Sequence, residues 1–69
     1  MRISARNTIG GTVKNVVQGA VNSEVVLRVA PGIEIVAMIS AHSAKALKLK
    51  KGKKAYAVIK ATSVMIAID

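Results

Sequence analysis

Residues 24–39, EVVLRVAPGIEIVAMI, carry the clearest structural signal in the sequence. Two runs of alternating side chains flank Pro31-Gly32, and Pro before Gly fits the two central positions of a type II turn, where glycine takes a positive φ. One face of each run is apolar: Val25, Leu27 and Val29 in the first, and Ile33, Ile35, Ala37 and Ile39 in the second. A period of two predicts strands over 24–30 and 33–39, joined by a tight turn.

Strand signals continue on both sides of this stretch. A first strand is expected after Asn7, and alternation predicts further strands over 55–60 and 62–68. Between them, Ser40 is a plausible N-cap for a helix of two to three turns that ends before Lys51-Gly52. Its Ala44 and Leu47 are expected to face the sheet. The order predicts a mainly β, OB-like five-stranded barrel with one short helix between strands 3 and 4.

Composition bounds the class of protein. The chain has 69 residues, enough for one domain over 1–69, and 52% of them are hydrophobic, which argues against disorder. It has no cysteine for a disulfide or thiolate site, and no apolar run long enough to cross a membrane. Its start lacks the apolar segment of a signal peptide, so a cytoplasmic location is expected. Apolar residues on both faces of several strands predict packing against other subunits in an oligomer.

The titratable residues argue against catalysis and against a cation site. The acidic residues are only Glu24, Glu34 and Asp69, too few and too scattered for paired carboxylate chemistry. His42 is the single histidine and is expected to be an exposed helix residue. We therefore expect a protein that is not an enzyme and holds no metal cation.

The net charge of +8 calls for an anionic partner or a role in solubility. Six of the eleven positive charges lie between Lys45 and Lys54, which could contact nucleic acid. OB-type nucleic-acid binders stack bases on aromatic side chains, and Tyr56 is the only aromatic residue here. A small basic nucleic-acid-binding barrel therefore remains the alternative function, beside a cluster that only keeps an apolar oligomer in solution. A third possibility is an accessory subunit that docks a larger protein.

Two segments carry hydrogen-bond donors without acids. Ser4-Ala5-Arg6-Asn7 places a hydroxyl, a guanidinium and an amide directly before the first strand, and Arg fits tetrahedral oxyanions through its fork of donors. Ser40 and Ser43 offer hydroxyls at the start of the short helix. Lys60 follows an apolar run and needs a counter-charge. Together these residues predict a site for a small oxyanion.

The same residues carry a resemblance to the TOBE-type family of molybdate-binding domains. It runs from about Arg2 to Asp69, through Ser4–Asn7, Gly10 and Gly11 with Val13, Gly19–Val25, Ile39–Ser43, Leu47–Gly52 and Ala57–Val64. The family often has Thr where Ser40 stands, which keeps the hydroxyl. It often has Gly where Lys48 stands, so the turn after the helix is expected to differ in detail.

The resemblance implies the fold, the ligand and the assembly. The family has an OB-like barrel, forms intertwined dimers, and in stand-alone form builds a hexamer as a trimer of dimers. It binds molybdate or tungstate at subunit interfaces, which implies intracellular storage and homeostasis with no organic cofactor. The implied oxyanion ligands are Ser4, Ala5, Arg6, Asn7, Ser40, Ser43, Lys60 and Ala61.

Overall fold

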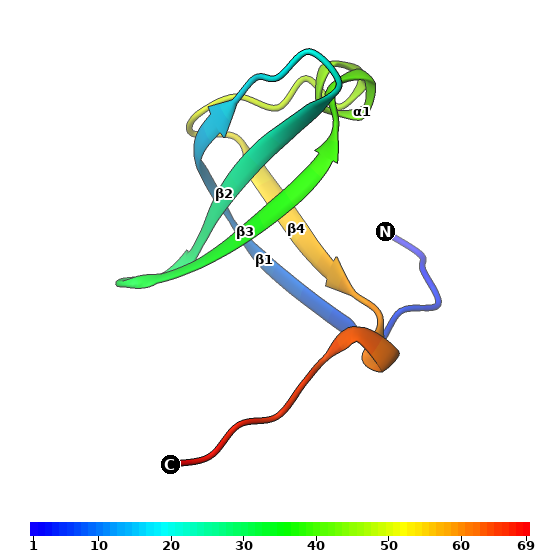
Figure 1. Cartoon of the computed structure of the whole chain (residues 1–69), viewed down its shortest axis with the longest axis vertical. Helices are drawn as coiled ribbons and strands as arrows, with labels where there is room; N and C mark the ends of the chain where they lie inside the picture. Colours follow the sequence, from blue (N-terminus) through cyan, green and yellow to red (C-terminus); the bar gives the residue numbers. More distant parts are fainter.

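The chain folds into one curled antiparallel sheet (Figure 1). The computed structural model describes all of residues 1–69. Its strands are β1 (Asn7–Val17), β2 (Asn22–Ala30), β3 (Ile33–Ser40) and β4 (Lys54–Ile59), arranged in the order β3-β2-β1-β4. One short helix, α1 (Ala41–Ala46), separates β3 from β4. The expectation of a mainly β fold with one short helix between the third and fourth strands is confirmed.

The β2–β3 hairpin forms as its sequence predicts. Arg28 pairs with Glu34 across the two strands, and Gly32 takes a φ of 75° in the turn. The alternation also places its faces correctly, because Val25 and Leu27 are buried. The hairpin therefore supplies most of the small core, which Val13 of β1 completes.

The start of α1 confirms Ser40 as the N-cap. The Oγ atom of Ser40 accepts a hydrogen bond from the backbone N–H of Ser43 at 3.0 Å, and so satisfies one of the free N–H groups of the first turn. Ala44 is buried against the sheet, as expected. The helix is six residues long, which is less than two turns and shorter than the sequence suggested.

The end of α1 differs from expectation because the chain turns out of the helix early. The N–H of Leu49 bonds to the carbonyl of Ala44 at 3.1 Å, and that of Lys48 bonds to the carbonyl of Lys45 at 3.0 Å. These two bonds form a Schellman motif, and Lys48 occupies its left-handed position with a φ of 53°. Leu47 becomes the C-cap and is 58% exposed, but it faces the sheet as expected, because it lines an apolar hollow together with Val25 and Leu27.

The expected fifth strand over 62–68 does not form within the chain. Residues Ala61–Ser63 form a 3-10 helix, η1, and residues 64–69 have no regular structure and run away from the sheet (Figure 1). A strand exists only when its backbone groups pair with a neighbour, and this segment has no neighbour in its own chain. Residues 64–69 therefore have the alternating apolar sequence of a strand but no strand of their own chain to pair with.

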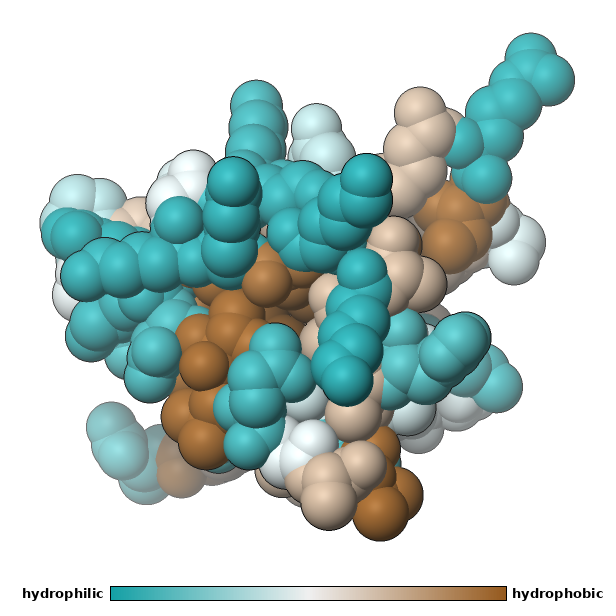
Figure 2. All heavy atoms as spheres, turned by 90° about the horizontal axis from the view of Figure 1, so that it is seen from above, coloured by the Kyte–Doolittle hydropathy of each residue, from teal (hydrophilic) through white to brown (hydrophobic).

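The inner face of the curled sheet is open and apolar. Only six of the 69 residues are buried, so the core of a single chain is very small. Beside it lies a hollow of about 350 Å³ lined almost entirely by apolar side chains, among them Leu27, Ile35, Ile39 and Leu49. Figure 2 shows apolar atoms at the surface between long hydrophilic side chains. No helix is long and apolar enough to span a membrane.

Candidate oxyanion site

The first group of predicted site residues meets at one end of the sheet. Strand β1 begins at Asn7 and runs antiparallel to β4, which ends at Ile59, and these two residues pair. The residues before β1 and those after β4 therefore lie together. The Nδ2 atom of Asn7 reinforces this by donating to the carbonyl oxygen of Ile59 at 3.3 Å.

The chain turns sharply just after β4, which fixes the backbone around Lys60. The N–H of Ser63 bonds to the carbonyl of Lys60 at 2.9 Å, and the N–H of Val64 bonds to that of Ala61 at 3.3 Å. Lys60 is extended, with φ −62° and ψ 132°, and begins the short turn η1. Its side chain is exposed and free to meet a ligand.

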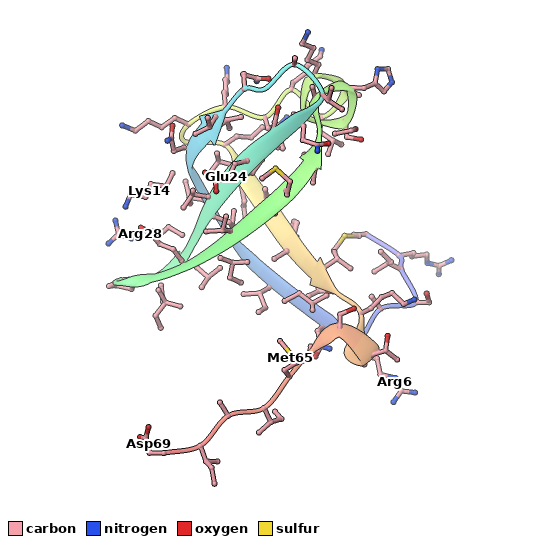
Figure 3. All side chains as sticks on the ribbon, viewed as in Figure 1. Arg6, Lys14, Glu24, Arg28, Met65 and Asp69 are labelled. Atoms are coloured by element: carbon pink, nitrogen blue, oxygen red, sulfur yellow. The ribbon has the colours of Figure 1, made fainter.

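The first group offers mainly exposed donors. Ser4, Arg6, Lys60 and Ala61 are exposed, whereas Ala5 and Asn7 are half-buried. Figure 3 shows Arg6 at this end of the molecule with its guanidinium pointing outward. Neither cation pairs with a carboxylate, because the only ion pair of the chain joins Lys14 to Glu34. The cluster therefore carries two uncompensated positive charges.

The second group lies at the start of α1. Ser40 Oγ donates to Ser43 Oγ at 2.8 Å while it accepts from the N–H of Ser43. Ser40 is exposed and Ser43 is half-buried. The proton of the Ser43 hydroxyl has no partner within the chain, so it remains available to an acceptor outside.

Within one chain the two groups are not brought together. Helix α1 lies at one end of the long axis in Figure 1, and Arg6 lies near the other end in Figure 3. A single copy thus presents two separate partial clusters. An oxyanion bound by both would have to contact two chains.

Sequence reasoning missed a second basic feature, a hollow on the outer face of the sheet. Lys14, Arg28 and Lys51 contribute to its lining. These residues are far apart in the sequence, and their meeting depends on irregularities in strand pairing that an alternating pattern does not reveal. No group of three His, Cys, Asp or Glu side chains gathers anywhere in the chain.

These observations define a class: a small OB-like β protein with donor-rich, acid-free clusters suited to an anion. The model of the TOBE domain family matches residues 3–66. The chain belongs to the TOBE domain family, and the resemblance noted in the sequence is confirmed.

Two of the similar proteins match this chain over nearly the whole length of both chains. A probable molybdenum-pterin-binding protein of Haemophilus influenzae is 42% identical over 69 residues, which is 100% of both chains. The structure of a molybdate-binding protein from Sporomusa ovata has a TM-score of 0.91 at 38% identity, covering 99% of this chain and 100% of that one. The cytoplasmic molybdate-binding protein ModG, solved with molybdate bound, has a TM-score of 0.83 at 44% identity. That comparison covers 88% of this chain and 43% of ModG.

Proposed function

We propose that this protein binds molybdate or tungstate in the cytoplasm, at interfaces between copies of the chain, and serves to store these oxyanions and maintain their supply without catalysis. The observation that carries the proposal is the pair of acid-free donor clusters around Arg6 with Lys60 and around Ser40 with Ser43. The names of the full-length relatives, which are binding proteins for molybdate or molybdenum-pterin, support it.

The chemistry of the ligand fits the chemistry of the clusters. Molybdate at neutral pH is a dianion whose four oxygens only accept hydrogen bonds. Guanidinium, ammonium, hydroxyl and backbone N–H groups all donate, and charge-assisted bonds from Arg and Lys are the strongest of these. A carboxylate would repel the ion, and neither cluster contains one.

The separation of the two clusters supports a site between subunits. If the Ser40 end of one copy meets the Arg6 end of another, the two half-sites enclose an ion that neither could enclose alone. The complete ligand set would then be Ser4, Ala5, Arg6, Asn7, Lys60 and Ala61 from one copy, with Ser40 and Ser43 from the other.

The exposed apolar surface supports an intertwined oligomer, proposed as a hexamer built from three dimers. The tail side chains Met65, Ile66 and Ile68 are 92%, 87% and 92% exposed, which is costly for a free monomer. The inner hollow is apolar and open at the same time. Insertion of the tail of one copy beside the sheet of another would supply the absent fifth strand and cover both surfaces.

The nucleic-acid alternative has less support. The ammonium group of Lys53 donates to the carbonyl of Leu47 at 2.6 Å, so one cation of the Lys45–Lys54 cluster is already engaged at the helix end. Tyr56 is 52% exposed and shares one face of β4 with Lys54, but it is the only aromatic side chain of the protein. The cluster thus offers charge with a single aromatic residue for stacking, where OB-type binders use several.

Isothermal titration of the assembled protein with sodium molybdate tests the proposal. We expect saturable heat with a dissociation constant of about 1 μM or tighter at moderate salt. Parallel titrations with tungstate and sulfate determine selectivity among tetrahedral dianions, and native mass spectrometry gives the assembly and the number of ions. Absence of saturable molybdate binding by a folded oligomer would overturn the proposal.

A further inference from the structure

A basic hollow lies on the outer face of the sheet, away from the two oxyanion clusters. Its volume is about 550 Å³, and it is lined by parts of β1, the end of β2 and the turn before β4. Lys14, Arg28 and Lys51 come from these three segments, and the half-buried Val29 and the exposed Pro31 contribute apolar surface. Figure 3 shows Lys14 and Arg28 projecting from the same side of the sheet.

Two irregularities of strand pairing build this hollow. The register between β1 and β2 shifts between Val13 and Asn15, which leaves Lys14 as an extra residue. The register between β2 and β3 shifts between Arg28 and Ala30, which leaves Val29 as another. A bulge bends the strand and re-aims its side chains, and bulges are enriched beside functional sites. Both extra residues line the same hollow.

The charge of the hollow is positive and only partly neutralised. Glu34 forms an ion pair with Lys14, and their side chains are 37% and 56% exposed. A pair that is this exposed contributes little to stability, so a stronger anion can displace it at small cost. Arg28 and Lys51 have no carboxylate partner. Three cations therefore surround the hollow against one acid.

We propose that this hollow is a second ligand site, which takes a small molecule with a diphosphate group and an attached ring. Phosphate oxygens match the guanidinium fork of Arg28, and the two ammonium groups supply further charge. The hollow is shallow and open to solvent, but it is wider than one tetrahedral oxyanion requires. The apolar surface of Val29 and Pro31 offers a place for the ring.

Titration calorimetry of the assembled protein at low ionic strength tests this site, with inorganic pyrophosphate and ADP as probes. We expect both to bind, with ADP binding more tightly because its ring reaches the apolar surface. The double variant Arg28→Gln with Lys51→Gln should weaken both by about tenfold or more. Arg28→Lys, which keeps the charge but loses the fork, should weaken them to a smaller extent.

The matched control is Lys45→Gln with Lys50→Gln, which removes the same charge elsewhere on the surface. Unchanged affinity in this control supports the hollow, whereas an equal loss in both double variants would indicate general electrostatic attraction and overturn the site. If ADP binds no more tightly than pyrophosphate, the proposed contact between the ring and the apolar surface is wrong.

If a single-stranded oligonucleotide binds more tightly than ADP and loses affinity in the Arg28→Gln, Lys51→Gln variant, the hollow binds nucleic acid and the proposal of a small ligand is overturned. Molybdate titration of the Arg28→Gln, Lys51→Gln variant, expected to be normal, keeps this result separate from the oxyanion proposal.

Discussion

The side-chain amide of Asn7 donates to the carbonyl oxygen of Ile59, and this bond ties the residues before β1 to those after β4. It holds the backbone that carries Arg6 close to the backbone that carries Lys60. The geometry of the first donor cluster therefore depends on a contact between two chain segments that are far apart in sequence.

Asn7→Ala should loosen this cluster without unfolding the sheet. One partly buried hydrogen bond contributes about 1 kcal/mol, so the free energy of unfolding in urea should fall by that amount. Molybdate affinity should fall as well, because the donors would no longer be held in place. A variant that loses stability but binds molybdate normally would remove Asn7 from the site and leave it a structural role only.

Lys60→Gln should weaken molybdate binding by about tenfold to a hundredfold, since a hydrogen bond to a charged group contributes about 1.5 to 3 kcal/mol. Calorimetry at two salt concentrations measures the loss and its electrostatic part. Lys45→Gln is the matched control, because it removes one charge from the exposed helix surface. Equal effects of the two variants would show that net charge, and not a specific contact, governs binding.

Ser40 allows the helix cap and the anion site to be separated. Ser40→Asp retains an N-cap acceptor, since Asp and Ser cap helices about equally well, and stability should change little. The new carboxylate would repel a dianion, so molybdate binding should be lost. Ser40→Thr should keep both properties. Normal molybdate binding by the Asp variant would place the anion away from α1.

Lys48→Gly should stabilise the chain. The φ of 53° at Lys48 is left-handed, a conformation that costs a residue with a side chain roughly 1 kcal/mol relative to glycine. The gain is reduced because glycine is more flexible when unfolded, so we expect a net increase of up to about 1 kcal/mol in urea unfolding. Lys48→Val, with a β-branched side chain at the same position, should destabilise the chain and serves as the opposite control.

The fold was predictable where local chemistry and packing agree. Alternation and the Pro31-Gly32 turn place the β2–β3 hairpin correctly, and Ser40 caps the helix as its position suggests. The length of the helix was overestimated because apolar spacing does not reveal that a Schellman turn ends the helix at Ala46. The pattern of apolar residues indicates which side chains are buried, but it does not indicate where the helix ends.

The candidate site was predictable only as a set of residues. Antiparallel pairing of β1 with β4 explains why Arg6 and Lys60 lie at one end of the sheet, but these strands are not consecutive, so their order in the sequence does not give the pairing. The distance from that end to Ser40 depends on the curl of the sheet, which no local pattern encodes. The outer hollow was missed for a related reason. The bulge at Lys14 adds one residue to β1, and neither the composition nor a turn residue marks its position.

The tail offers the most direct test of assembly. Its apolar alternation predicts that Val64, Ile66 and Ile68 share one face, and in the single chain Ile66 and Ile68 are 87% and 92% exposed. Ile66→Asp with Ile68→Asp should therefore prevent the tail from covering the inner hollow of a second copy, because burying two carboxylates there is unfavourable. Native mass spectrometry should find the proposed hexamer in the unmodified protein and smaller species, down to the 7.2 kDa single chain, in the variant.

Met65→Asp is the control for the tail, since its side chain lies on the opposite face of the alternating pattern, and it should disturb the assembly less. Molybdate binding should be lost together with the oligomer, because each half-site would then lack its complement. A hexamer that survives Ile66→Asp with Ile68→Asp would place the subunit contacts elsewhere. A monomer that still binds molybdate with full affinity would show that one donor cluster suffices, and would overturn the intersubunit site.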